Sequence, residues 1–278
     1  MTFSNFLRGM VSAAGILVLG GVAMAADLPS RKEATPAPVY IDAFQPFQVR
    51  LRMTAVIPDG NTTAYDSYGL ILPTVGLSGG AGSQIYGANA KISTSIIPEL
   101  DVSYFFTKNI AVEAICCVSY HKATGTGTLA GLDIGKTWAF PPTVLLQYHF
   151  TNFGAFQPYV GVGVNFTAFF GTNAGNNWAP FLTPAGVVGL NTVNSLKIGT
   201  SWGVAGQVGF DYMITQNWGV NVDLKRIMME PTAYGTVYNN LAGYVPFRAK
   251  LNIDPWLVSA GVTYRFGGAS AGPVVAKY

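Results

Sequence analysis

The chain has 278 residues, of which half are hydrophobic and only 10% are charged, well below the roughly 25% of soluble domains. Its 33 Gly, 17 Phe, 14 Tyr and 5 Trp residues exclude a helical bundle or coiled coil, and so much apolar surface excludes a disordered chain. A net charge of +3 without a basic run excludes nucleic acid as a partner.

The first 25 residues have the three parts of a secretory signal. Arg8 gives a positive start, residues 10–22 form an apolar core, and Ala23-Met24-Ala25 is a small-residue cleavage site. A membrane anchor is the alternative, but the apolar run is shorter than the ~20 residues of a spanning helix. We therefore predict export with cleavage after Ala25. The next segment, residues 26–45, is rich in Pro and Ala and is expected to be an extended periplasmic lead-in.

After the signal, no run of 18 or more apolar residues lacks Gly, Pro or polar interruptions, so no second spanning helix is expected. An exported, charge-poor chain of this kind can still cross a membrane as a closed β-barrel, because a barrel bonds every backbone N–H and C=O between strands. Composition thus predicts a location in the outer membrane of a Gram-negative bacterium.

From residue 46 the chain shows strand periodicity. Phe47, Val49 and Leu51 alternate with Gln48 and Arg50, giving one apolar and one polar face. Seven further segments are predicted as strands: 99–106, 110–120, 143–150, 158–170, 196–212, 218–228 and 248–266.

The links between these strands alternate in length. Three are short, at 107–109, 151–157 and 213–217, and four are long, at about 58–98, 121–142, 171–195 and 229–247. Short periplasmic turns alternating with long extracellular loops are typical of transmembrane barrels. We predict an all-β, eight-stranded antiparallel transmembrane barrel over residues 46–266, with a tail over 267–278. A soluble lipocalin-like barrel, whose apolar face turns inward, is disfavoured by the loop lengths and the scarcity of charge.

Strand alternation also predicts which polar side chains face the lumen. Arg or Lys facing lipid at the bilayer midplane costs about 2–4 kcal/mol, so an inward position is favoured. The predicted polar belt consists of Arg50, Arg52, Asp101, Glu113, Gln147, His149, Asp223, Lys225 and Arg265. One interpretation is a set of ion pairs that fill a narrow interior. The other is a polar floor that blocks ions and water.

Aromatic residues gather near the predicted extracellular mouth. Trp138, Phe140, Phe169, Phe170 and Trp178 are candidates for an apolar ligand zone, with Phe181 close by in sequence. The alternative for these residues is the aromatic girdle that marks each membrane interface. Trp218, Trp256 and Tyr264 are interpreted as girdle residues.

The sequence has few residues in arrangements that would allow catalysis or metal binding. His121 has Ser119 two residues before it but no acid nearby, and His149 adjoins a periplasmic turn. Cys116 and Cys117 are adjacent in a predicted strand and cannot pair with each other, so inert thiols are favoured over a redox role. No metal-ligand spacing is present. We expect no reaction, no metal and no cofactor.

Three segments together resemble the OmpW family of small outer-membrane channels. They are VRLRMTAVIPDG at 49–60, PPTVLLQYHFTNFGAFQPYVGVGVNFTAFF at 141–170 and NIDPWLVSAGVTYRF at 252–266. With residues 214–227 between them, the resemblance covers most of residues 46–266. It implies an eight-stranded barrel that is not a catalyst, with a largely hydrophobic lumen taken to pass small apolar molecules. It also supports a lateral exit into the lipid.

The C-terminus departs from the family pattern. Barrels of this kind usually end on a Phe that the insertion machinery recognises, whereas Tyr264 and Phe266 precede twelve further residues. Either this internal pair is the insertion signal or the terminal Tyr278 replaces it.

The function expected from the sequence is an outer-membrane channel for small hydrophobic solutes. Its expected partners are outer-membrane lipid, lipopolysaccharide, these solutes and the insertion machinery. The alternative is a structural or stress-related barrel, or a surface receptor, with a plugged lumen. Paired charges along the whole lumen would favour that alternative, and an open apolar pocket above the charges would favour transport.

Overall fold

The computed structural model describes residues 44–66, 83–176, 190–239 and 243–268. These residues belong to one compact unit, residues 41–272. The predicted signal, Trp178, Phe181 and Tyr278 lie outside the described residues. No helix in the described part of the chain is long and apolar enough to span a membrane.

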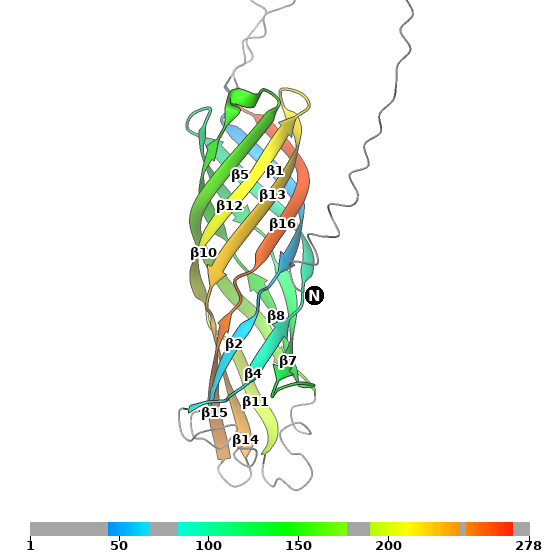
Figure 1. The fold of residues 1–278 in the computed structure, drawn as a ribbon, viewed down its shortest axis with the longest axis vertical. Helices are drawn as coiled ribbons and strands as arrows, with labels where there is room; N and C mark the ends of the chain where they lie inside the picture. Colours follow the sequence, from blue (N-terminus) through cyan, green and yellow to red (C-terminus); the bar gives the residue numbers. More distant parts are fainter. Residues whose placement is uncertain (1–43, 67–82, 177–189, 240–242, 269–278) are drawn as a thin grey trace, which may run out of the picture. The chain divides into compact units, whose positions relative to one another are not determined.

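Eight antiparallel strands close into a barrel (Figure 1). They follow one another around the ring in chain order, and β16 closes it by pairing with β1. The strands are β1 (Phe47–Ile57), β5 (Ser95–Phe105), β6 (Ile110–Cys116), β9 (Thr143–His149), β10 (Phe156–Ala174), β12 (Ser201–Met213), β13 (Trp218–Met229) and β16 (Trp256–Phe266). The predicted fold class is confirmed.

One end of the barrel carries the short connections. Residues 106–109 and 214–217 are tight turns, and the 3₁₀ turn η3 (Thr151–Phe153) joins β9 to β10. Gly154 follows η3 with φ +67°, a left-handed conformation that glycine adopts without strain. Short turns mark the periplasmic end of an outer-membrane barrel, so this end faces the periplasm.

The long links were predicted as loops, and this was wrong over much of their length. They contain strands that prolong the barrel beyond its other end (Figure 1). These strands are β2 (Asn61–Asp66), β3 (Ser83–Gln84), β4 (Ala88–Ile92), β7 (Ser119–Gly127), β8 (Asp133–Phe140), β11 (Leu190–Ile198), β14 (Thr232–Asn239) and β15 (Gly243–Asn252). We call this part the extracellular extension.

The extension consists of two sheets rather than a closed ring. β4, β7, β8 and the end of β10 form one sheet, and β3, β2, β15, β14 and β11 form the other. Within the described ranges, no backbone ladder joins β2 to β4 or β10 to β11. The two seams begin where the membrane part of the barrel ends, because the β1–β5 ladder stops at Val56 and Ser95 and the β10–β12 ladder stops at Thr167 and Ser201.

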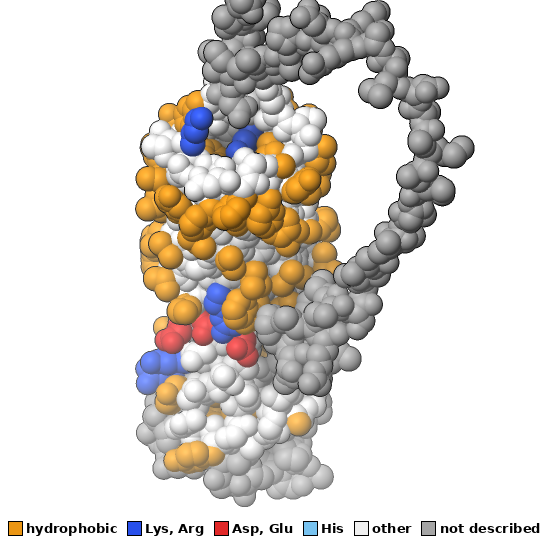
Figure 2. All heavy atoms as spheres, turned by 45° about the horizontal axis from the view of Figure 1, so that its top comes forward, with side chains coloured by type: hydrophobic (Ala, Val, Ile, Leu, Met, Phe, Trp, Pro, Cys, Tyr) orange, Lys and Arg blue, Asp and Glu red, His pale blue; other side chains and the backbone are white. Residues whose placement is uncertain are grey.

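The outer wall of the barrel is hydrophobic. Figure 2 shows apolar side chains covering the wall near the periplasmic end, with charged side chains gathered beyond this band. Aromatic rows mark its two edges. Tyr104, Tyr148 and Trp218 belong to the periplasmic row, and Trp138 and Trp202 to the extracellular row. This arrangement is that of a membrane-spanning wall between two interfaces.

Candidate functional site

The periplasmic half of the lumen is filled by buried charges, which we call the polar belt. Arg50 projects inward from β1, with Nη2 2.8 Å from Asp211 Oδ2 and Nε 3.1 Å from Asp211 Oδ1. Its Nη1 contacts Glu113, and its guanidinium carbon lies 4.8 Å from the ring centroid of Tyr159. One arginine thus joins strands from both sides of the barrel.

Arg52 forms a second centre two residues further along β1. Its Nη2 lies 2.7 Å from Glu99 Oε1 and contacts Asp101, and its Nη1 lies 3.7 Å from Asp223 Oδ1. Lys225 Nζ is 3.5 Å from the same oxygens of Glu99 and Asp223. The charges alternate in space, so each buried ion has an oppositely charged neighbour.

Neutral groups add hydrogen bonds to the ion pairs of the belt. The side-chain amides of Gln147 and Gln207 donate to Glu113 Oε2 at 2.7 and 2.9 Å. The Tyr159 hydroxyl donates to Asp223 Oδ2 at 2.9 Å. His149 Nε2 lies 3.0 Å from the side-chain oxygen of Gln147. The belt is therefore a connected network of buried polar groups.

The structure places all nine residues of the predicted belt in this network, with Arg265 at its periplasmic edge, 3.4 Å from Asp211. It adds polar residues that the sequence analysis did not single out: Gln48, Glu99, Tyr159, Gln207, Asp211 and Asn221. Strand alternation was sufficient to find several of them, because Gln48 shares a face with Arg50, and Glu99 shares a face with Asp101.

The lumen changes character beyond the belt. Thr54 donates to Ser259 across the β1–β16 pair at 2.8 Å, and near this level the inward side chains become mostly apolar. One buried cluster, with Val56, Ile97 and Leu145 among its members, lies within the barrel. A second, with Ala64 and Val237, lies in the extracellular extension.

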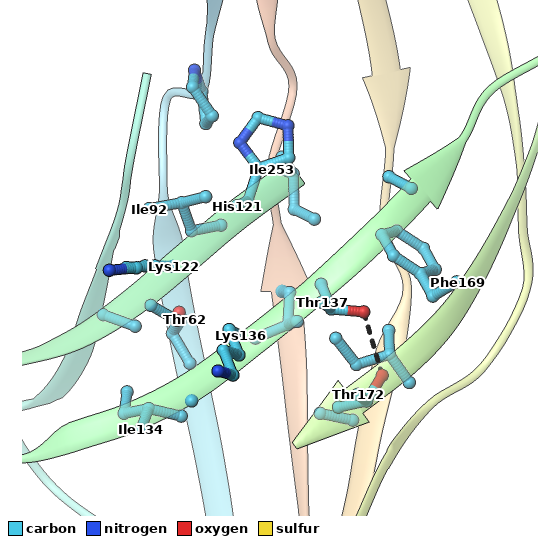
Figure 3. A pocket seen from close by; sticks show the side chains of 18 of the residues that line it. Thr62, Ile92, His121, Lys122, Ile134, Lys136, Thr137, Phe169, Thr172 and Ile253 are labelled. Carbon is cyan, nitrogen blue, oxygen red and sulfur yellow. Dashed lines mark hydrogen bonds between the residues drawn. The ribbon is translucent and has the colours of Figure 1, made fainter. Parts of the chain in front are cut away.

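A cavity of about 170 Å³ lies between these clusters, more than ten times the ~10–15 Å³ that one water needs. Its walls come from strands on all sides of the extension (Figure 3). Small inward residues such as Ala64, Ala90, Ala233 and Ala249 leave this space open. Ala64, Ala90 and Ala233 lie in segments that were predicted as loops, and Ala249 lies in a predicted strand whose lumen-facing apolar residues were not singled out.

Several polar groups in the cavity wall are hydrogen-bonded within the protein. Thr137 and Thr172 share a hydrogen bond of 2.9 Å between their hydroxyls (Figure 3). His121 Nδ1 lies 2.8 Å from the Ser93 carbonyl and therefore carries the proton, so Nε2 accepts from the Ser119 hydroxyl at 2.9 Å. Burial lowers the pKa of His121, which lies beyond the extracellular aromatic row, so the ring stays neutral near pH 7. The cavity therefore presents an apolar surface.

Of the four described residues in the predicted apolar ligand zone, only Phe169 lies in the cavity wall. Trp138 and Phe170 are 43% and 48% exposed on the outer surface. Strand alternation is the reason: Phe169 and Phe170 are consecutive and must face opposite sides, and Thr137 and Ala139 occupy the inward positions around Trp138. Phe140 shares the face of Trp138 and is not part of the cavity wall. Trp178 lies outside the described residues.

The OmpW family model matches residues 46–266. The chain belongs to the OmpW family. The uncharacterized outer-membrane protein y4mB of Sinorhizobium fredii is 37% identical over 263 residues, which are 95% of this chain and 98% of that protein. Outer membrane protein W of Vibrio cholerae is 32% identical over 241 residues, 83% of this chain and 93% of that protein.

A solved outer-membrane protein has a fold similar to that of this OmpW-family chain. The crystal structure of the outer membrane protein OprG from Pseudomonas aeruginosa matches with a TM-score of 0.66 and 25% identity, covering 81% of this chain and 98% of OprG. Together with the barrel architecture, the relatives place this OmpW-family protein in the outer membrane of a Gram-negative bacterium.

The predicted insertion signal lies on the outer wall at the periplasmic end. Tyr264 and Phe266 stack with ring centroids 5.9 Å apart, and Tyr264 also contacts Trp218 at 4.6 Å. Phe266 stacks on Phe47 at 5.5 Å, so the two ends of the OmpW-family barrel meet there. These positions are those of girdle residues, and recognition by the insertion machinery stays a prediction.

Proposed function

We propose that the protein is a channel through which small hydrophobic molecules cross the outer membrane, and that it catalyses no reaction. The observation that carries this proposal is the apolar cavity of the extracellular extension, located beyond a lumen filled with charge. A solute that is poorly soluble in water gains free energy in such a cavity, at roughly 25 cal/mol for each Å² of apolar surface removed from water.

The polar belt is proposed to close the direct path to the periplasm. Arg50 and Arg52 each hold two or more carboxylates in a water-poor lumen, and a passing ion would have to break these contacts at high cost. An apolar solute that entered the belt would disrupt the polar contacts between these side chains and could not form polar contacts in their place. The belt thus acts as a floor below the cavity.

A solute that cannot pass the floor must leave sideways, as the family resemblance also implies. The inner ends of the seams between β2 and β4 and between β10 and β11, at the membrane boundary, are the proposed exits, because no backbone ladder joins the described residues there. At the first seam a side chain replaces the ladder: Asn89 Oδ1 accepts from the Thr62 amide at 2.9 Å. A side-chain bond opens at less cost than a ladder.

The plugged structural barrel is the competing function. A barrel of that kind would have paired charges along the whole height of its lumen. In the described residues the charged network ends at Lys225 and Arg52, and most of the side chains that line the lumen beyond them are apolar. This distribution favours transport.

Filling the cavity tests the proposal. Ala249→Trp places an indole in the cavity, and Tyr234→Trp is its control, because Tyr234 lies on the neighbouring strand and is 54% exposed on the outside. The measurement is the uptake rate of a small apolar fluorophore by vesicles whose outer leaflet is lipopolysaccharide. We expect at least a tenfold slower rate for Ala249→Trp and an unchanged rate for Tyr234→Trp.

The same assay tests the direction of exit. A quencher in the bilayer and a trapped cyclodextrin in the vesicle interior report where the fluorophore arrives first. Lateral exit predicts arrival in the bilayer. Normal uptake by a correctly folded Ala249→Trp variant would overturn the cavity as the transport path.

A further inference from the structure

Three exposed lysines lie together on the outer face of the extracellular extension. Lys122 on β7 is directly opposite Lys136 on β8 (Figure 3). Lys91 on β4 is opposite Thr124, which lies two residues from Lys122 on the same face of β7. Because diagonal neighbours in a sheet are roughly 7–8 Å apart, the three ammonium groups form one patch, which we call the lysine patch.

The charges of the lysine patch are not balanced by the protein. Two like charges directly opposite each other in a sheet destabilise the strand pairing. Elsewhere on the outer wall, by contrast, Arg226 forms an ion pair with Asp59. In the described part of the chain, the ammonium groups of Lys91, Lys122 and Lys136 have neither an ion pair nor a hydrogen bond.

A small hollow accompanies the two opposed lysines. Lys122 and Lys136 line it together with Gly135, Gly175 and Asp133, among others. One carboxylate against three lysines leaves the patch with a net charge of +2. The hollow and the excess charge suit an anion that bridges the two strands.

The depth of the patch identifies the anion. Tyr120 pairs with Trp138, and their rings lie 5.0 Å apart, while Trp138 stacks on Phe170 at 6.5 Å. This outward aromatic row marks the headgroup level of the membrane. Lys122 and Lys136 each lie two residues further out than this row, or about 6.6 Å along the strands. Their ammonium groups are therefore at the depth of lipid phosphates.

We propose that Lys91, Lys122 and Lys136 bind a phosphate of lipopolysaccharide, the phosphorylated glycolipid of the outer leaflet. The acyl chains would lie along the apolar wall below the aromatic row, and the phosphate would bridge the opposed lysines. This inference does not depend on the solute that the cavity takes.

The test compares lipid A with its dephosphorylated form. Affinity for the purified full-length protein in detergent is measured by native mass spectrometry. The triple variant Lys91→Gln, Lys122→Gln and Lys136→Gln removes the charge of the patch. The matched control is Lys108→Gln, an exposed lysine in the periplasmic turn between β5 and β6.

The triple variant should bind lipid A at least about tenfold more weakly, since each surface lysine contributes to headgroup attraction. Lys108→Gln should bind like the unaltered protein. Dephosphorylated lipid A should bind the unaltered protein as weakly as lipid A binds the triple variant. Heat-modifiable gel mobility checks that each variant is folded.

Two results would overturn the inference. One is equal affinity of the unaltered protein and the folded triple variant for lipid A. The other is displacement of lipid A by inorganic phosphate at equal concentration, which would assign the patch to the free anion and not to the glycolipid.

Discussion

The two halves of the barrel differ in which side of the wall is polar. In the membrane, Leu146 and Val162 face outward to lipid, and Arg50 and Glu113 face inward. In the extracellular extension, Tyr234 faces outward to water and Ala233 faces the cavity. The two halves of one chain thus carry two opposite patterns. The solvent outside each half determines the pattern, because lipid excludes the charges that water accepts.

The contrast also explains why only one half has a cavity. An eight-stranded barrel is just wide enough for side chains to fill it. Arginine, glutamine and tyrosine side chains fill the periplasmic half, whereas alanines at positions such as 64, 233 and 249 leave space in the other. A polar lumen has to be full, because a buried ion needs its partners within contact distance. An apolar lumen can stay open.

The largest effect is expected where a buried charge loses its partner. Arg50→Ala leaves Glu113 and Asp211 without their main counter-ion inside the barrel. Breaking a buried pair costs about 3–5 kcal/mol of unfolding free energy. The measurement is urea unfolding of the protein in lipid vesicles, followed by tryptophan fluorescence.

The control for Arg50→Ala is Arg226→Ala on the outer wall. Arg226 lies 3.3 Å from Asp59, whose side chain is exposed, and such pairs contribute less than about 1 kcal/mol. Equal losses for the two variants would contradict a water-poor polar belt.

A smaller effect is expected when an arginine is introduced on the outer surface of each half of the barrel. Val162→Arg puts a charge in the lipid-facing wall, where Val162 is 67% exposed, and should cost about 2–4 kcal/mol. Tyr234→Arg puts it in the water-facing wall and should change the free energy of unfolding by less than about 0.5 kcal/mol. Vesicle unfolding measures both, and similar values would contradict the inversion of polarity between the halves.

The smallest effect is expected at the border between the halves. Thr54→Val removes the partner of the Ser259 hydroxyl and should cost about 1–3 kcal/mol, because a buried polar group is left unbonded. Adding Ser259→Ala replaces both partners and should restore most of that loss. A double variant that loses the sum of the two single effects would show that the pair does not act as one unit.

The sequence predicted the membrane part of the fold with good accuracy for a physical reason. Lipid imposes a strict alternation, which is visible in Phe47, Val49 and Leu51 against Gln48 and Arg50. The same alternation predicted the inward positions of Arg52 and Lys225. It failed in the long links, where water outside and an apolar cavity inside invert the pattern and weaken its contrast.

The candidate site was predicted less well than the fold. Trp138 and Phe170 were expected in the ligand zone because aromatic side chains are apolar, yet their strand register turns them to the outer surface. Phe169, one residue away from Phe170, faces the cavity. A one-residue difference in register separates a girdle residue from a cavity residue, and composition cannot resolve it.

The sequence by itself determined the membrane environment, the number of barrel strands and the belt of inward charges, because each follows from local alternation and link length. The tertiary structure decided which charges contact each other, where the polar lumen ends and where the cavity opens. These features depend on residues far apart in the chain, such as Arg50 and Asp211, which meet only when the ring of strands closes with one particular register.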